Sequence, residues 1–359
     1  MRQPRLITFC LSFMLTRIGG FSVSRRQALV GGAAAVAAIG ISSKAQASTL
    51  YQPSNVQNKL IVITGGNTGL GLESAKRLAA AGARVVITVR SSTKGEQALA
   101  NIQSYLQERG VASTKISYVL MDLTDFDSVQ QAAKTLSTGS QKIDVLLNNA
   151  GVMAIPEREI TKDGYERTFQ TNHLGHFVFT AKLMSQLAPD ARIVNVSSEA
   201  HKIAQAFQPY NLNGEEEYGP WSSYSLSKLS NILFTKELQR RVDEAGKDYT
   251  VVSLHPGVVA TDLGRYLVGE KKFNRMKTEG MTLKESILFG LLNKFTKTVE
   301  DGASTQIFAA ADPSMPQNKG AYLKDCTVVS RLQASAEDPA NAAQLWKASE
   351  EMTHVKFEL

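Results

Sequence analysis

The chain has 359 residues and a formal net charge of +7, with 43% hydrophobic and 20% charged residues. This is the composition of a soluble globular protein, long enough for one large or two ordinary domains. Six of the 40 basic residues and none of the 33 acidic residues lie in residues 1–47, which leaves 34 basic against 33 acidic residues elsewhere. The basic balance belongs to the N-terminal segment, so we expect no nucleic-acid partner.

Residues 1–47 are expected to be a targeting leader rather than part of the fold. One apolar run spans Leu6–Leu15, and a second, rich in Ala and Gly, spans Ala28–Ile41 after a pair of arginines. The second run resembles a twin-arginine export signal and ends at Ala45-Gln46-Ala47, a small-residue cleavage pattern. Neither run reaches the roughly 20 apolar residues that a membrane-spanning helix needs.

Two such signals in series, with Gly20-Phe21 after the first, resemble the leaders of plastid proteins in algae with complex plastids. We therefore expect a plastid protein, and the twin-arginine element indicates the thylakoid lumen. A single N-terminal membrane anchor and a bacterial-type export leader are the alternatives.

The cysteines and histidines show no metal-binding pattern. Cys10 lies in the leader, so Cys326 is left without an intrachain partner and is expected to be a small buried residue. His173 and His176 are not spaced as metal ligands, and we interpret them as packing or backbone-satisfying residues. The sequence predicts no metal site.

Strand-like and helix-like stretches alternate after a polar connector, residues 48–58. The expected strands are Leu60–Ile63, Arg84–Val89, Ile116–Met121, Ile143–Leu147, Arg192–Val196 and Thr250–Leu254. The expected helices are Glu73–Ala81, Lys94–Glu108, Asp127–Leu136 and Gly164–Leu187. This alternation predicts an α/β fold with a doubly wound parallel sheet. We expect a single domain over residues 59–335, with a small substrate cap, and a C-terminal helical tail over residues 336–359.

The first expected strand runs into a glycine-rich turn, Thr64–Gly71, which opens a helix. Glycines let a pyrophosphate approach the backbone, and a helix N-terminus adds N–H groups and a favourable dipole. The turn therefore predicts a dinucleotide site. Its candidate residues are Gly65, Asn67, Thr68, Gly69, Leu70 and Gly71.

The end of the second strand indicates which dinucleotide is bound. An acidic residue there would bind a ribose 2′-hydroxyl, but this strand ends at Arg90, and Lys94 follows with no acid between them. Arg90 can pair with a 2′-phosphate, with Lys94 in support. The sequence favours NADP(H) over NAD(H), with a solvated Arg90 as the alternative.

Two further strand ends supply candidate cofactor contacts. Asp122-Leu123 follows the third strand, where the Asp could bind an adenine amino group or cap the next helix. Small residues after the fourth strand would leave room for the cofactor, and the asparagine amides there could tie strand ends together. These candidates are Asn149, Ala150 and Gly151, for which an ordinary Asn/Gly turn is the alternative.

Tyr224 and Lys228 are four residues apart, which places both side chains on one face of a helix. A lysine ammonium beside a phenol favours the phenolate and lowers the phenol pKa from its usual value near 10. The pair could therefore act as a general acid or base near neutral pH.

Together these motifs resemble the short-chain dehydrogenase/reductase superfamily, whose Rossmann fold is a doubly wound parallel sheet. The resemblance covers about Lys59–Asp325 and rests on Thr64–Gly71, Asn148–Gly151, Asn172, Ile193–Ser198, Tyr224, Lys228 and Pro256-Gly257. The retinol-dehydrogenase-like branch is the most similar, through Thr171–Phe177, Val196–His201, Ser227–Phe234, Leu254–Val258 and Gly320–Cys326. Light-dependent protochlorophyllide reductases share Asn172–Phe177.

The resemblance implies an NADP(H)-dependent oxidoreductase that interconverts a carbonyl and an alcohol. Tyr224 would exchange a proton with the substrate oxygen, and Lys228 would lower its pKa and hold the nicotinamide ribose. Ser198, rather than Ser197, would bind the substrate oxygen, and Asn172 would hold a water in a relay to Lys228. The expected contacts at the nicotinamide end are Pro256, Gly257, Val259 and Thr261.

Two variable segments bear on the substrate. The insertion Ala204–Trp221 carries four aromatic residues, which suit a bulky apolar substrate or form the core of a surface flap. Asp262–Phe295 is interpreted as a cap helix or as a peripheral membrane contact. We expect a lipophilic, retinoid- or isoprenoid-like substrate and, by resemblance, a homo-oligomer. A pigment-ring reductase and a non-catalytic NADP(H)-binding sensor or scaffold are the alternatives.

Overall fold

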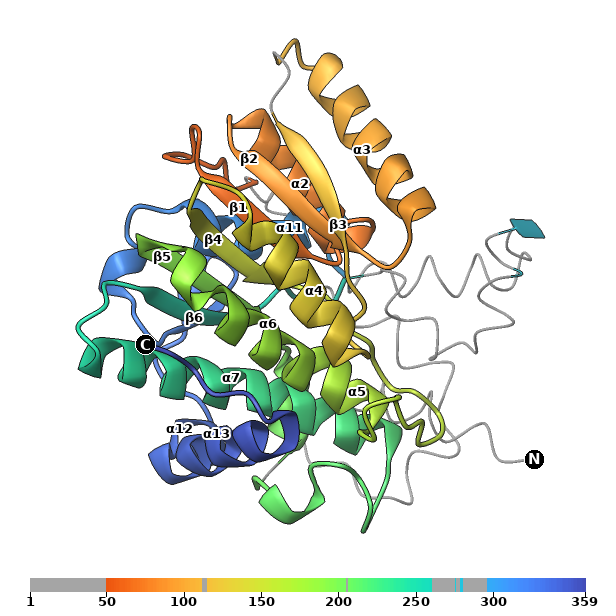
Figure 1. The fold of residues 1–359 in the computed structure, drawn as a ribbon, viewed down its shortest axis with the longest axis vertical. Helices are drawn as coiled ribbons and strands as arrows, with labels where there is room; N and C mark the ends of the chain where they lie inside the picture. Colours follow the sequence, from red (N-terminus) through yellow and green to blue (C-terminus); the bar gives the residue numbers. More distant parts are fainter. Residues whose placement is uncertain (1–49, 112–114, 205, 260–274, 276–277, 280–295) are drawn as a thin grey trace, which may run out of the picture. The chain divides into compact units, whose positions relative to one another are not determined.

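The computed structural model describes residues 50–111, 115–204, 206–259, 275, 278–279 and 296–359 (Figure 1). The expected leader, Thr261 and most of the segment Asp262–Phe295 lie outside these residues. Residues Thr49–Leu359 form one compact unit. Among the described residues, no helix combines the length and the apolar character needed to cross a membrane.

An eight-stranded sheet in the order β3-β2-β1-β4-β5-β6-β7-β8 organises the fold. The strands are β1 (Leu60–Thr64), β2 (Arg84–Val89), β3 (Ile116–Leu120), β4 (Ile143–Asn148), β5 (Leu187–Val196), β6 (Thr250–His255), β7 (Tyr322–Lys324) and β8 (Thr327–Val328). All neighbours are parallel except β7 and β8. The expected doubly wound parallel sheet is confirmed. The strand order reverses between β1 and β4, and in such sheets ligands bind outside the carboxyl ends of these strands.

Helices cover both faces of the sheet (Figure 1). One layer holds α2 (Gly69–Ala80), α3 (Ser92–Gln107) and α11 (Val299–Ala311), and the other holds α4 (Phe126–Ser137), α6 (Gly175–Leu183) and α7 (Pro220–Glu244). Successive β1 side chains face opposite layers, because Ile61 and Ile63 join one hydrophobic cluster and Val62 the other. Both sheet faces are thus buried, which explains the continuous apolar strands.

The helix before β5 contains an irregular turn. It begins as α5 (Arg167–Phe169), widens into the π-helix η1 (Gln170–Leu174), and continues through α6 to the 3-10 turn η2 (Met184–Gln186). The sequence had predicted one regular helix here. Gly175 allows close packing at this point, because a Cβ there would lie 2.8 Å from the Leu123 carbonyl oxygen. π-helical turns are rare and occur frequently at functional sites.

The connector and the tail belong to the domain. Tyr51 of the connector packs its ring edge against Phe308, with centroids 5.3 Å apart. In the tail, α12 (Ala334–Glu337) and α13 (Pro339–Thr353) lie against α7. The Trp346 ring contacts those of Phe177, Phe234 and Phe357 at centroid distances of 5.3, 6.0 and 4.6 Å. Leu345 and Trp346 of the tail helix are therefore buried against the domain.

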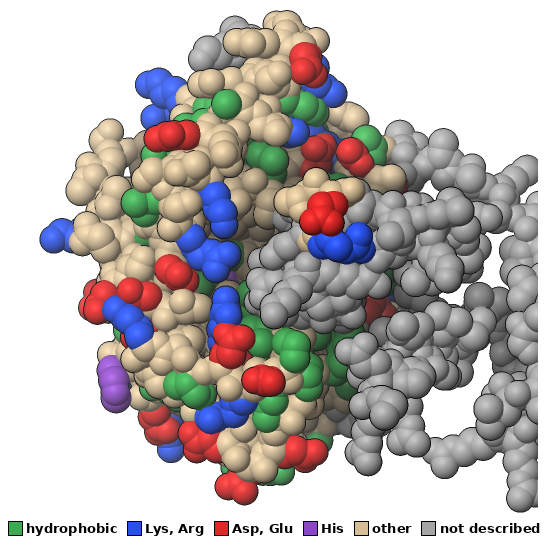
Figure 2. Space-filling model, turned by 90° about the vertical axis from the view of Figure 1, so that its right-hand side faces the viewer, with side chains coloured by type: hydrophobic (Ala, Val, Ile, Leu, Met, Phe, Trp, Pro, Cys, Tyr) green, Lys and Arg blue, Asp and Glu red, His purple; other side chains and the backbone are tan. Residues whose placement is uncertain are grey.

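Shorter elements complete the part of the chain that the structure describes. These are the 3-10 turns η3 (Glu199–Ile203), η4 (Pro209–Asn211) and η6 (Met315–Gln317). Cys326, expected to be buried, is only half-buried, because it lies in the two-residue turn between β7 and β8 with a φ of +55°. Acidic and basic side chains are interspersed over the described part of the face drawn in Figure 2.

Replacing Trp346 tests how far the tail supports the core. Trp346→Ala should lower the free energy of unfolding by about 3–5 kcal/mol, because it leaves a cavity beside three phenylalanines. Gln344→Ala, at an exposed position of the same helix, is the matched control and should change it by less than about 0.5 kcal/mol. Denaturant titration measures both, and equal stabilities would show that the tail is dispensable for the core.

Candidate active site

The glycine turn leaves a helix N-terminus available for an anion. Gly65 and Gly69 adopt φ values of +65° and +53°, which glycine tolerates without strain. Thr68, the N-cap residue of α2, makes no side-chain cap hydrogen bond, and the first turn of α2 holds no acid. Its first N–H groups and the helix dipole therefore fit a pyrophosphate.

The turn packs tightly against the end of β4. A Cβ on Gly71 would lie 2.5 Å from Asn149 Nδ2, and one on Gly65 would lie 2.9 Å from Ala150 Cβ. Asn149 Nδ2 donates to the Thr64 carbonyl at 2.8 Å. The structure thus brings the expected cofactor residues of the two strand ends together.

Helix α11 joins this group to the loop after β6. A Cβ on Gly302 of α11 would lie 2.8 Å from Leu70 Cδ2 and 2.5 Å from Val259 Cγ2. Because α11 approaches so closely, the expected cofactor residues Leu70 and Val259 both pack against Gly302.

A second uncapped helix N-terminus lies where the 2′-phosphate is expected. Exposed Arg90 directly precedes Ser91, the N-cap residue of α3, which makes no side-chain cap hydrogen bond. Asn67 and Lys94 line one surface cavity of about 200 Å³. Its remaining lining residues are Leu72, Gln97, Ala98 and Asn101. The donors present fit a phosphate group.

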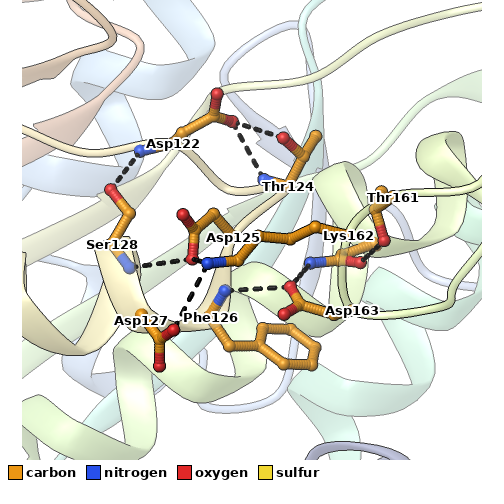
Figure 3. Close-up of polar contacts among 10 residues, drawn as sticks. Asp122, Thr124, Asp125, Phe126, Asp127, Ser128, Thr161, Lys162 and Asp163 are labelled. Carbon is orange, nitrogen blue, oxygen red and sulfur yellow. Dashed lines mark hydrogen bonds and ion pairs between the residues drawn. The ribbon is translucent and has the colours of Figure 1, made fainter.

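Asp122 forms a local turn after β3 and does not cap the next helix (Figure 3). Its Oδ1 accepts from the backbone N–H and the hydroxyl of Thr124, at 3.0 and 2.8 Å. The cap of α4 is Asp125, which accepts from the Ser128 N–H at 3.1 Å. The capping alternative for Asp122 is therefore wrong. The predicted adenine contact of Asp122 and buried Leu123 stays a prediction.

Figure 3 also shows how the loop before η1 holds the start of α4. Lys162 Nζ lies 2.6 Å from the Asp125 carboxylate and 3.3 Å from that of Asp127. Asp163 accepts from the Phe126 N–H at 2.9 Å and from the Gln170 amide at 2.6 Å. Because Gln170 begins η1, these contacts tie the predicted adenine side to the helix that carries Asn172.

The asparagine at the end of β4 ties strand ends together, as expected. Asn148 Nδ2 donates to Asn195 Oδ1 of β5 at 2.9 Å.

Gly151, three residues further along the chain, borders the catalytic side chains. A Cβ on Gly151 would lie 3.1 Å from Asn172 Oδ1 and 3.6 Å from Lys228 Nζ. A glycine here keeps the space between these two polar groups free of a side chain.

Tyr224 and Lys228 lie buried on α7, beside the end of β5. Lys228 Nζ donates to the Val196 carbonyl at 2.9 Å and lies 5.7 Å from the Tyr224 ring centroid. The Ser198 hydroxyl is near enough to Tyr224 to lower the pKa of its phenol, and its Oγ accepts from the Ala200 N–H at 3.2 Å. The fold therefore brings the three predicted catalytic residues together.

Burial controls the protonation of this pair. It raises the pKa of Tyr224 to about 12, although the Ser198 hydrogen bond acts in the opposite direction. It also lowers the pKa of Lys228 to about 8. The pKa of Tyr224 is therefore raised overall rather than lowered as expected, because desolvation disfavours the phenolate more than the Ser198 hydroxyl favours it. At neutral pH the phenol keeps its proton.

The two serines at the end of β5 differ in role. Ser197 is buried, and its hydroxyl donates to the Lys228 carbonyl at 2.7 Å. Ser198 is less buried and reaches Tyr224. The geometry therefore agrees with the choice of Ser198 as the residue that faces the reaction centre.

Asn172 clamps the backbone of the loop after β4. Its Oδ1 accepts from the Val152 N–H at 2.8 Å, and its Nδ2 donates to the Val152 carbonyl at 3.0 Å. The second amide hydrogen goes to Ser227 Oγ at 2.9 Å. Only a lone pair of Oδ1 remains for a water, so the predicted proton relay through Asn172 stays a prediction.

The loop after β6 leaves the sheet through Pro256 and Gly257. Gly257 adopts a φ of +98°, and a Cβ there would lie 2.7 Å from Lys297 Cδ. The Lys297 N–H donates to the Val258 carbonyl at 2.8 Å, which fixes this loop beside the sheet. The next predicted contact, Thr261, lies outside the described residues.

The aromatic residues of the insertion have different surroundings. Trp221 packs edge-on against Tyr224 with centroids 6.1 Å apart. Phe207 joins the hydrophobic core, and the Tyr218 hydroxyl donates to the Ile155 carbonyl at 2.7 Å. Tyr210 is 73% exposed. Phe207 therefore belongs to the core of the domain rather than to a separate flap, and the predicted contact of these aromatic residues with a substrate stays a prediction.

Two hydroxyls within the motifs, Thr64 and Ser227, have structural roles that the sequence did not predict. Thr64 Oγ1 accepts from the N–H groups of Asn149 and Ala150, both at 2.9 Å. Ser227 Oγ links Asn172 to the Tyr224 carbonyl, to which it donates at 2.7 Å. The sequence signals for these roles are the position of Thr64 at the end of a strand and that of Ser227 between Tyr224 and Lys228.

Comparison with known proteins agrees with this geometry. The family model described as short chain dehydrogenase matches residues 59–272. Retinol dehydrogenase 12 of Mus musculus is 36% identical over 313 residues, 85% of this chain and 90% of that protein. Retinol dehydrogenase 11 of Homo sapiens is 37% identical over 311 residues, 86% of this chain and 89% of that protein.

A solved structure gives the same picture. The crystal structure of a blue fluorescent protein from a metagenomic library, in complex with NADPH, matches with a TM-score of 0.55 and 25% identity. The match covers 75% of this chain and 97% of that one. The sheet order and the family and relative matches agree with each other. The chain therefore belongs to the short-chain dehydrogenase/reductase superfamily, in the retinol-dehydrogenase-like branch.

Proposed function

We propose that the protein is an NADP(H)-dependent oxidoreductase that interconverts a carbonyl and an alcohol on a lipophilic, retinoid- or isoprenoid-like substrate. The observation that carries the proposal is the convergence of Ser198, Tyr224 and Lys228 at the carboxyl end of β5. The relatives' names, which include retinol dehydrogenases, support the substrate class.

The side chains divide the chemistry of a reduction between them. The bound cofactor supplies the hydride. Tyr224 donates a proton to the carbonyl oxygen, since burial keeps its phenol protonated at neutral pH. Ser198 donates a hydrogen bond to the same oxygen and stabilises the charge that develops there. Lys228, with a pKa of about 8, is mainly charged at pH 7 and favours the phenolate left behind.

The choice of NADP(H) rests on the surroundings of Arg90. An exposed arginine, the uncapped start of α3 and Lys94 together offer charge and N–H donors to a 2′-phosphate. Two solved structures of similar fold carry NADPH or NADP in their titles, which supports the same choice here.

The lipophilic substrate and the cellular setting extend the proposal. Trp221, packed beside Tyr224, gives the reaction centre an apolar neighbour. We further propose that the leader directs the protein to a plastid, that it contacts a membrane peripherally, and that it forms a homo-oligomer.

Removing the phenol oxygen tests the proton donor. Tyr224→Phe should lower the rate of NADPH oxidation with retinal-like and other apolar aldehydes by about 10²–10⁴-fold, the usual contribution of general acid catalysis. The dissociation constant for NADPH, measured by fluorescence titration, should stay within about twofold. Turnover close to the wild-type rate would overturn the assignment.

Replacing Arg90 tests the cofactor choice. Arg90→Gln should weaken NADPH binding by about 10–100-fold and leave NADH binding nearly unchanged, because a charge-assisted pair with the 2′-phosphate is lost. Arg109→Gln removes an exposed arginine just beyond the opposite end of α3 and should change neither affinity. Equal affinities of the wild-type protein for NADPH and NADH would contradict the proposal.

The pKa of Lys228 predicts the pH dependence of reduction. Its folded pKa of about 8 lies below the usual 10.5, so the ammonium loses its charge at a lower pH than a free lysine. At saturating NADPH, kcat for reduction should be level near pH 7 and fall above about pH 8, while Tyr224 stays protonated to about pH 12. A rate that remains level up to pH 10 would show that the charge of Lys228 is not used.

A further inference from the structure

His176 lies between the cofactor strand and the helix turn that carries Asn172. It is 3% exposed, near the start of α6. Its Nε2 lies 2.8 Å from Thr64 Oγ1, at the end of β1. Its Nδ1 lies 3.2 Å from the carbonyl oxygen of Asn172, in η1. One imidazole thus contacts both halves of the site.

The partners of Thr64 fix the direction of these hydrogen bonds. Thr64 Oγ1 already accepts from the N–H groups of Asn149 and Ala150. A hydroxyl that accepts twice still has its own hydrogen to donate, so it donates to His176 Nε2. The imidazole is then neutral with its hydrogen on Nδ1, which donates to the Asn172 carbonyl. Complete burial, which lowers the pKa of His176 to about 4, agrees with the neutral form.

The contacts continue on both sides of this bridge. Toward the cofactor, Asn149 Oδ1 accepts from Gln306 of α11 at 2.7 Å. Toward the reaction centre, Asn172 donates to Ser227, which donates to the Tyr224 carbonyl. A buried hydrogen-bond chain therefore runs from the β1 and β4 strand ends to the helix of the catalytic tyrosine, and His176 is its middle member.

We infer that His176 is a positioning residue that couples the cofactor-binding strand ends to Asn172 and the tyrosine helix. The inference rests on the proposed function, since it assigns His176 to the same site. The imidazole touches no reacting atom; it sets the distance between the backbone of Thr64 and that of Asn172. Its loss leaves the hydroxyl hydrogen of Thr64 without its acceptor and removes one hydrogen bond from the Asn172 carbonyl.

His173 provides a matched control on the same helix. It is equally buried, and burial also lowers its pKa, to about 3. Its Nε2 bonds with Ser349 Oγ of α13 at 2.8 Å, and its ring lies against Phe169 and Phe234. It therefore faces the tail helix rather than the cofactor, and a purely structural role would make the two histidines equivalent.

The test compares His176→Phe with His173→Phe in the full chain. Both should lower the melting temperature, since each loses a buried hydrogen bond. Only His176→Phe should raise the NADPH dissociation constant, by about tenfold, and His176→Gln should restore it to within about threefold because an amide can donate and accept. Equal NADPH affinities for the two Phe variants would overturn the inference.

The tautomer gives a second measurement that needs no variant to fold. In ¹⁵N-histidine-labelled wild-type protein at pH 7, His176 and His201 should both be neutral with the hydrogen on Nδ1, since His201 Nδ1 lies 2.6 Å from the Ser198 carbonyl oxygen. The His176 ring signal, assigned through its connection to the backbone resonances, should shift when NADP⁺ is added. A His176 ring without its hydrogen on Nδ1, or no shift of the His176 signal at saturating NADP⁺, would refute the coupling. If NADP⁺ binds but no carbonyl is reduced, the proposed function fails, and the NMR shift on addition of NADP⁺ still tests the coupling.

Discussion

The reversal of strand order between β1 and β4 is the constraint on which the site depends. Neighbouring parallel strands end at the same edge, so the glycine turn after β1 and Asn149–Gly151 after β4 must meet there. The absence of side chains at Gly65 and Gly71 permits that contact, since any Cβ would collide with the opposite strand end. The end of β5 then presents Ser198 to Tyr224 from the next position in the sheet.

Burial gives the site its chemical character. Desolvation keeps Tyr224 protonated, and it also lowers the pKa of Lys228 to about 8. A protonated phenol beside a cationic amine suits proton donation to a carbonyl oxygen, and the loss of that proton leaves a phenolate that the amine stabilises. Neutral His176 extends this logic, because only an uncharged imidazole can both accept from Thr64 and donate to Asn172.

Much of the fold could be predicted because the parallel strands are buried on both faces and so form continuous apolar runs. Strands β7 and β8, with three and two residues, are too short for such a signal. The π-helical turn at Asn172 could not be seen either, since its residues continue a helical pattern. The spacing of Tyr224 and Lys228 predicted their proximity, but the direction of the Tyr224 pKa shift depends on burial, which the spacing does not contain. The clamp between Asn172 and Val152 likewise arises from tertiary packing.

The central claim is that the protein transfers a hydride from NADPH to a carbonyl carbon while Tyr224 supplies the proton. A single-turnover reaction with NADPH deuterated at C4 on the transferred face, with an apolar aldehyde as substrate, tests it most directly by mass spectrometry of the alcohol. The account predicts one deuterium on the carbinol carbon, and a sharp loss of labelled product in Tyr224→Phe. An unlabelled alcohol, or labelled product formed equally well without the phenol, would contradict it.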